Sequence, residues 1–129
     1  SQRGHIAKAA LEGIALSVAS LVRIAEESIG HGLGELAVDG GAAASNSLLQ
    51  AQADSTGLTI RRPTNLESTA KGVALLAGLQ AGAISDLEGL AGQREKEAET
   101  FTPSIDIPTR NAWISKWEDA VTRSLKWHE

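Results

Sequence analysis

The fold of this chain is decided by the stretch LAVDGGAAASN, residues 36–46. A short apolar segment leads into two adjacent glycines, Gly40 and Gly41, and a helical pattern begins within a few residues. Residues without a Cβ allow a sharp backbone turn and the close approach of another molecule. A helix that begins there points unpaired N–H groups and the positive end of its dipole into the gap. The stretch predicts either a tight strand-to-helix link or a turn that binds a phosphate.

Composition indicates one globular domain of 129 residues that binds neither nucleic acid nor a membrane surface. Apolar residues make up 42% of the chain, and acids and bases are mixed along it to a net charge of −4. Nucleic-acid and membrane-surface proteins concentrate Lys and Arg instead. Because the chain has no cysteine, disulfides and thiolate chemistry are excluded, and a reducing, cytoplasmic location fits. No apolar run approaches the ~20 residues that span a bilayer, and the N-terminus lacks a signal-peptide pattern.

Upstream of the glycine turn, periodicity predicts a helix over residues 4–29, ended by three closely spaced glycines. Apolar residues at spacings of three and four would form its core-facing side, namely Ile6, Ala10, Ile14, Val18, Leu21 and Ala25. Further apolar residues lie outside that face, namely Leu11, Ala15, Leu16 and Val22. A helix that is apolar over most of its girth is expected to be buried on most sides.

Around and after the turn, the pattern alternates between strands and helices. Residues 35–38 form the strand that enters the turn, and Ser45 or Asn46 caps a helix that ends near Gly57. Residues 58–62 alternate apolar and polar side chains up to a proline, which is typical of a second strand.

A third helix begins near residues 67–69 and carries small residues, with glycines at positions 72, 78 and 82. Interior glycines cost roughly 1 kcal/mol each against alanine, which suggests the close approach of another backbone or of a ligand.

Residues 83–108 read as a charged connector that leads to the last helix. It would contain one helical turn at 85–90, a solvated charged run at 93–97 and an aromatic anchor at Phe101. From Thr109 onward a final helix carries Trp113 and Trp117 on its apolar face, where they are expected to be core residues.

The order helix–strand–helix–strand–helix is typical of an α/β fold with parallel strands. Two strands alone make a poor sheet, so further strands must come from elsewhere. We therefore expect residues 1–129 to be a single partial domain. Unpaired strand edges and apolar surface would favour a homo-oligomer.

The remaining candidates for chemistry give few sites. The turn is not a dinucleotide fingerprint, because Ala44 stands where a third glycine is needed, and the Lys-Ser/Thr pair of a P-loop is absent. The histidines at positions 5, 31 and 128 do not share metal-ligand spacing, so we expect no metal site. Asp39 is expected to accept backbone N–H groups in the turn. Arg61 and Arg62 would form ion pairs at a domain edge or face a phosphate.

Several blocks of sequence resemble the C-terminal part of the FGGY carbohydrate kinases, in family order and spacing, over nearly the whole chain. The blocks are His5–Ala15, Leu36–Ala42, Gln50–Asp54, Arg62–Pro63, Glu67–Gly78 and Trp117–Trp127. The wording Val-Asp-Gly-Gly-Ala is nearer to the glycerol kinases of this family than to its xylulose kinases.

The resemblance implies part of a ribonuclease H-like (actin-like ATPase) domain, a βαβα core with an N-terminal and a C-terminal helix whose first strands are missing. Such kinases hold ATP and substrate in a cleft between two domains. By this similarity, the backbone N–H of Gly41, with that of Ala42, would face the α-phosphate, and Gly40 would provide space. The family places an asparagine beside adenine at the position of Ser45, so either Ser45 or the following Asn46 would make that contact.

The resemblance also implies which functions lie elsewhere. The catalytic aspartate, the Mg²⁺ ligands and the glycerol-binding residues of the family would lie in a missing N-terminal part, so the isolated chain is expected to have no kinase activity. The first helix departs from the family at residues 16–19, as does Lys71 in the third helix. Alternatives are another FGGY sugar kinase, or a non-catalytic module that binds nucleotide or a partner protein.

Overall fold

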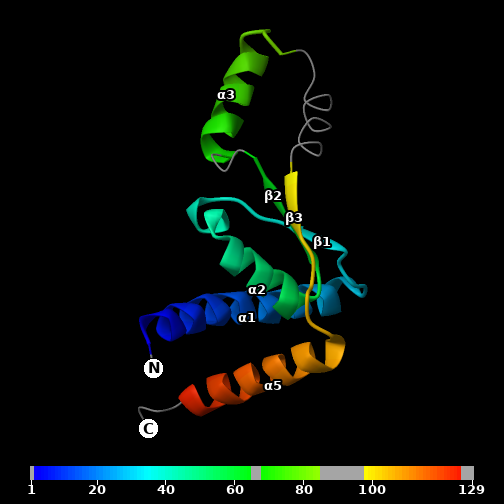
Figure 1. The fold of residues 1–129 in the computed structure, drawn as a ribbon. Coiled ribbons are helices and arrows are strands. Elements are labelled where there is room, and N and C mark those ends of the chain that lie inside the picture. The colour runs from blue at the N-terminus through cyan, green and yellow to red at the C-terminus, as the bar shows by residue number, and fades with distance from the viewer. Residues whose placement is uncertain (1, 65–67, 85–97, 126–129) are drawn as a thin grey trace.

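The computed structural model describes residues 2–64, 68–84 and 98–125, which form a mixed α/β fold, as predicted (Figure 1). The helical turn expected at 85–90 and the charged run at 93–97 lie outside these residues. In chain order the elements are α1 (Arg3–Ile29), β1 (Glu35–Ala37), the 3-10 helix η1 (Gly41–Ala44), α2 (Asn46–Thr56), β2 (Thr59–Pro63), α3 (Ser68–Gln80), β3 (Ala98–Phe101) and α5 (Ile107–Ser124).

The sheet has three described strands in the order β1–β2–β3. β1 and β2 are parallel, with Leu36 opposite Ile60, which confirms the predicted strand–helix–strand unit. β3 is antiparallel to β2, with Phe101 opposite Ile60 and Ala98 opposite Pro63. A strand within the segment 83–108 was not expected from its composition, and at Phe101 the extended connector is instead part of the sheet. The chain therefore supplies a third strand itself.

The core of this unit lies between α2 and the sheet. Ile60 at the centre of β2 and Ala53 on α2 are fully buried, and Leu49 is 1% exposed. Ala43 of η1 joins this cluster, and partly buried apolar side chains pack against it, namely Leu36, Val38 and Phe101. The alternation of apolar residues along β2 and the apolar stripe of α2 therefore meet as their periodicities predict.

α1 packs along α2 with one face only. Four of its residues are buried, namely Ala15, Leu16, Ala19 and Val22, and the Ser55 hydroxyl of α2 donates to the carbonyl of Ala15 at 3.2 Å. The face predicted to be buried is the exposed one: Ile6 and Leu21 are each 67% exposed. Because α1 is apolar on two sides, periodicity identifies both stripes but does not show which one α2 covers.

α1 is also long and apolar enough to cross a membrane, by length and composition alone, contrary to the expectation that no segment would be. A core helix of a protein in water passes the same test. Ion pairs lie on this helix, at Lys8–Glu12 and Arg23–Glu27, and Arg23 also pairs with Glu118 of α5 at 2.5 Å.

α5 begins two residues earlier than predicted, at Ile107, with Pro108 in its first turn, where a missing N–H costs nothing. Its N-cap is Asp106, whose carboxylate accepts the N–H of Thr109 at 2.8 Å. Hydrogen bonds from the side chain and backbone of Thr109 hold the pKa of Asp106 below its ordinary value. Trp113 and Trp117 were expected to be core residues, but both are only half-buried. The Trp117 ring lies beside α1, 3.8 Å from where a Cβ of Gly13 would be.

α3 stands apart from the other helices (Figure 1). The close approach expected at its glycines is a local one at Gly78, where a Cβ would lie 2.7 Å from the side chain of Ile84 in the turn that follows. At Gly72 no described atom lies within 4 Å of a Cβ position. The glycine at position 82 has φ of +71° and belongs to that turn rather than to the helix interior.

A polar tether joins the end of α2 to the segment after β3. The Asp54 carboxylate accepts the N–H of Ser104 at 2.6 Å and its hydroxyl at 2.9 Å. The Nε of Arg110 donates to the backbone carbonyl of Asp54 at 2.7 Å. These contacts join residues about fifty positions apart and place α5 against the α1–α2 pair.

Candidate functional site at the glycine turn

The double-glycine turn follows directly from the sheet. The N–H of Val38 donates to the carbonyl of Arg61 at 2.9 Å, which continues the β1–β2 pairing up to the turn. Gly40 then has φ of +85° and ψ of 174°, a conformation essentially restricted to glycine. The turn therefore needs a glycine at position 40 for backbone reasons, independent of any ligand.

Ser45 both ends η1 and begins α2. The N–H of Ser45 donates to the carbonyl of Ala42 at 3.1 Å and closes η1, while the Ser45 hydroxyl accepts the N–H of Leu48 at 3.3 Å and begins α2. Ser45 is thus the N-cap of α2, and Asn46 is its first residue. Of the two caps predicted, the structure selects Ser45.

The outer side of the turn is open. At Gly40 and Gly41 a Cβ would meet no described atom within 4 Å. Within the described residues, the N–H groups of Gly41 and Ala42 have no hydrogen-bond acceptor, as expected at the start of a helix. Ala43, by contrast, is 3% exposed and anchors η1 in the core. The turn therefore presents two backbone donors outward on a fixed base.

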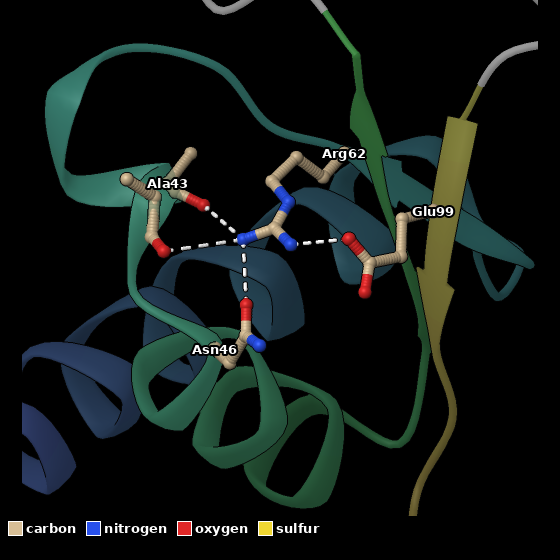
Figure 2. A network of polar contacts seen from close by, with 5 residues as sticks. Ala43, Asn46, Arg62 and Glu99 are labelled. Carbon is tan, nitrogen blue, oxygen red and sulfur yellow. Dashed lines mark hydrogen bonds and ion pairs between the residues drawn. The ribbon is translucent and has the colours of Figure 1, made fainter.

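Arg62 of β2 holds the inner side of the turn in place (Figure 2). Its Nη1 donates to the carbonyls of Ala43 and Ala44 at 3.0 and 3.2 Å and to the Oδ1 of Asn46 at 2.8 Å. Its Nη2 forms an ion pair with Glu99 of β3, and its Cζ lies 5.2 Å from the centre of the Phe101 ring. The end of η1, the start of α2 and the distant strand β3 therefore meet at this one guanidinium.

The neighbouring arginine has a separate partner. Arg61 forms an ion pair with Glu35 of β1 at 3.1 Å. The ion-pair interpretation of both arginines is thus confirmed. Asp39 differs from expectation, because its exposed carboxylate accepts no backbone N–H from the described residues.

The structure brings together the five residues that the sequence analysis proposes for nucleotide binding, Gly40, Gly41, Ala42, Ser45 and Asn46, on one short segment. It adds Arg62 and Glu99, whose part in the site sequence reasoning missed. The sequence shows two consecutive arginines at the end of a strand. The partner of Arg62, however, lies on β3, a strand that was not predicted. No group of three or more His, Asp or Glu side chains suited to a metal ion occurs among the described residues.

Comparison with known proteins identifies the family. Residues 1–81, which include the glycine turn and Arg62, match the C-terminal domain of the FGGY family of carbohydrate kinases. The chain belongs to this family. The glycerol kinase of Pseudothermotoga lettingae is 44% identical over 98% of the chain, and that of Aromatoleum aromaticum is 46% identical over 95%.

A solved structure agrees with both the fold and the family. The crystal structure of Plasmodium falciparum glycerol kinase with ADP superimposes with a TM-score of 0.83 at 29% sequence identity, over 97% of this chain. This likeness confirms the predicted actin-like ATPase fold class. The chain spans about a quarter of the length of each of these three relatives.

Proposed function

We propose that this chain forms the adenosine-binding side of an ATP-dependent glycerol kinase, which transfers the γ-phosphate of ATP to a glycerol hydroxyl in the cytoplasm. The single observation that carries the proposal is the glycine turn, with two unpaired backbone donors beside an open space. Support comes from glycerol kinases that are 44% and 46% identical to nearly the whole chain, and from a structural relative solved with ADP.

In this proposal each residue of the turn has a distinct part. Gly40 and Gly41 leave room for the nucleotide, and the N–H groups of Gly41 and Ala42 donate to α-phosphate oxygens. Such donors need no reorganisation when charge arrives, since η1 is already anchored in the core through Ala43. Ser45 and Asn46 lie at the start of α2, where adenine would be recognised.

The chemical step would be carried out by groups outside this chain. Phosphoryl transfer depends on positioning and on neutralising charge from several sides at once. The described residues offer no carboxylate cluster for Mg²⁺, so the ion would be held by other parts of the kinase, together with the catalytic base and the glycerol. The 129-residue chain by itself is proposed to have no kinase activity.

A substitution at Gly41 in the intact kinase tests the proposal. Gly41→Val places a branched side chain where the phosphate would lie, and it should raise the KM for ATP about tenfold or more while the KM for glycerol stays within twofold. Gly4→Val is a matched control, because Gly4 lies at the start of α1 with nothing within 4 Å of its Cβ position. An unchanged KM for ATP would remove Gly41 from the site.

Two further measurements separate the alternatives. If the intact enzyme ignores glycerol and phosphorylates another polyol or a ketose, the substrate assignment is wrong and another FGGY sugar kinase is indicated. If the 129-residue chain alone binds ADP tightly in a calorimetric titration, it acts as a self-sufficient nucleotide-binding module, because a half-site should bind weakly.

A further inference from the structure

We propose that Glu99 of β3 is a positioning residue for nucleotide binding: acting through Arg62, it fixes the orientation of η1 and therefore of the glycine turn. This inference rests on the proposed function and deepens it, because it extends the determinants of nucleotide affinity to a strand far from the turn in sequence. The affinity of the turn then depends on the acceptor oxygens of a side chain that is 59% exposed.

The alternation of side chains along β2 places its two arginines on opposite faces of the sheet. Arg62 follows the fully buried Ile60 by two positions, so it lies on the face of the sheet that packs against α2. Arg61 lies on the other face, where it pairs with Glu35 of β1 at 3.1 Å. Glu99 is directly opposite Arg62 in the antiparallel pairing of β2 with β3, and opposite residues share a face. Arg62 is therefore the arginine that reaches both the turn and β3.

The two terminal nitrogens of the Arg62 guanidinium contact different elements (Figure 2). Nη1 donates to the carbonyls of Ala43 and Ala44 at 3.0 and 3.2 Å, and these are the last two residues of η1. Nη2 is the nitrogen that pairs with the Glu99 carboxylate. Because a guanidinium is rigid and planar, a carboxylate that fixes Nη2 also limits where Nη1 can lie. The contact with Glu99 thus restricts the orientation of the carbonyls at the end of η1.

η1 transmits this restriction to the outward side of the turn. It has only four residues, from Gly41 to Ala44, and the N–H of Ala43 donates to the carbonyl of Gly40 at 3.1 Å. In so short a 3-10 helix the first and last peptide groups belong to almost the same turn, so a shift of the last carbonyls also moves the first N–H groups. Those N–H groups are the ones that the proposed function assigns to the phosphate.

The unequal burial of the two partners separates an effect on orientation from an effect on stability. The Arg62 side chain is 14% exposed, and its Cζ lies 5.2 Å from the centre of the Phe101 ring. Glu99, in contrast, is mostly in contact with solvent, and ion pairs with such an exposed partner contribute little to stability. Loss of Glu99 is therefore expected to release the guanidinium from its place without unfolding the domain.

The test compares Glu99→Ala with Glu35→Ala in the intact kinase, by steady-state kinetics with ATP and by calorimetric titration with ADP. Glu35 is the matched control, because it is 53% exposed and pairs with the adjacent arginine, Arg61, on the opposite face of the sheet. Glu99→Ala should raise the KM for ATP and the Kd for ADP about fivefold, while kcat and the KM for glycerol stay within about twofold. Glu35→Ala should leave all four constants unchanged, and neither substitution should move the urea midpoint of unfolding.

Two further variants show whether Glu99 acts through Arg62. Glu99→Gln keeps an acceptor oxygen for Nη2, so its KM for ATP should stay within about twofold of the unsubstituted enzyme. Arg62→Met removes every donor and should raise the KM for ATP about tenfold, and Glu99→Ala added to it should have no further effect. Circular dichroism shows whether the Arg62→Met protein is folded. If it is not, Arg62→Lys, which keeps the charge without the planar fork, takes its place in the double substitution.

Three results would overturn the inference. One is a KM for ATP and a Kd for ADP that Glu99→Ala leaves unchanged. Another is an equal rise with Glu35→Ala, which would show that the effect does not depend on Arg62. The third is an effect of Glu99→Ala that adds in full to that of the Arg62 substitution. If Gly41→Val raises the KM for ATP in the same series, the proposed function survives each of these results, whereas an unchanged KM in Gly41→Val removes the proposed function and this inference with it.

Discussion

The packed side of α2 and the outer face of α1 differ in how their apolar surface is covered. On the packed side, Leu49 and Ile60 are buried between α2 and the sheet by elements of the same chain. On the outer face of α1, which we define as Ile6, Ile14, Leu21 and Ile24, each side chain is between 49% and 67% exposed. Both surfaces are apolar in sequence, but only one has a partner among the described residues.

The glycine-turn side of the domain is thus packed by elements of the described chain, whereas α1 has a second apolar face that no described element covers. Within the described residues, the contacts that hold the glycine turn come from β1, η1, α2, β2 and β3. The outer face of α1 is an exposed stripe of large apolar residues of the kind that marks an interaction surface. Pairs of substitutions on the two surfaces should differ in their effects on stability and association.

Truncation of matched leucines should give the largest contrast. Leu49→Ala removes a side chain that is 1% exposed, and it should lower the free energy of unfolding by about 2–5 kcal/mol, because it leaves a cavity in the core. Leu21→Ala on the outer face of α1 should change it by less than about 0.5 kcal/mol. Urea unfolding followed by circular dichroism measures both. Comparable losses would mean that the outer face is covered after all.

A glycine pair should give an intermediate contrast. Gly57 ends α2 with φ of +75°, and a Cβ there would lie 2.8 Å from the Arg110 guanidinium. Gly57→Ala should lower the free energy of unfolding by about 2 kcal/mol through backbone strain and displacement of Arg110. Gly72→Ala, in the helical and open setting of α3, should raise it by about 0.5–1 kcal/mol. A stable Gly57→Ala protein would contradict the tight packing of α5 against α2.

A charge on the outer face of α1 should give the smallest contrast. We expect the 129-residue chain to self-associate through exposed apolar surface, and Leu21→Glu should weaken this association about tenfold, equivalent to ~1.4 kcal/mol. Ile107→Glu is the control, because Ile107 is 65% exposed but lies on α5. Sedimentation at several concentrations measures both. A chain that is monomeric at high concentration without substitution would contradict the expectation.

Sequence alone predicts the parts of the fold whose contacts are local. The double glycine, the cap at Ser45 and the alternation along β2 each depend on a few neighbouring residues, and these were predicted within one or two positions. The structural match confirms the fold class that the resemblance implied. The predicted strand-to-helix turn lies where the structure places it, between β1 and α2.

The missed features are those that depend on distant partners. β3 has only four residues, and its pairing with β2 brings Glu99 to Arg62 and Phe101 to Ile60 across about forty positions of sequence. No local pattern indicates such a pairing. The buried face of α1 was also predicted wrongly. This helix has apolar residues on two sides, and which side is buried depends on where α2 packs. The role of Arg62 could be found only after β3 was placed.

The pairing of β2 with β3 has a last consequence for how this domain can change. Pro63 lies opposite Ala98, so the pairing of β2 with β3 holds the two ends of the segment 64–97, which contains α3, close together. This closing pair lies next to the Arg62–Glu99 ion pair. Doubling the length of a flexible segment between two paired strands adds only about 0.6 kcal/mol to the entropic cost of closing the loop. Insertions and deletions between β2 and β3 can therefore change the length of the segment 64–97 while the geometry of the glycine turn stays the same.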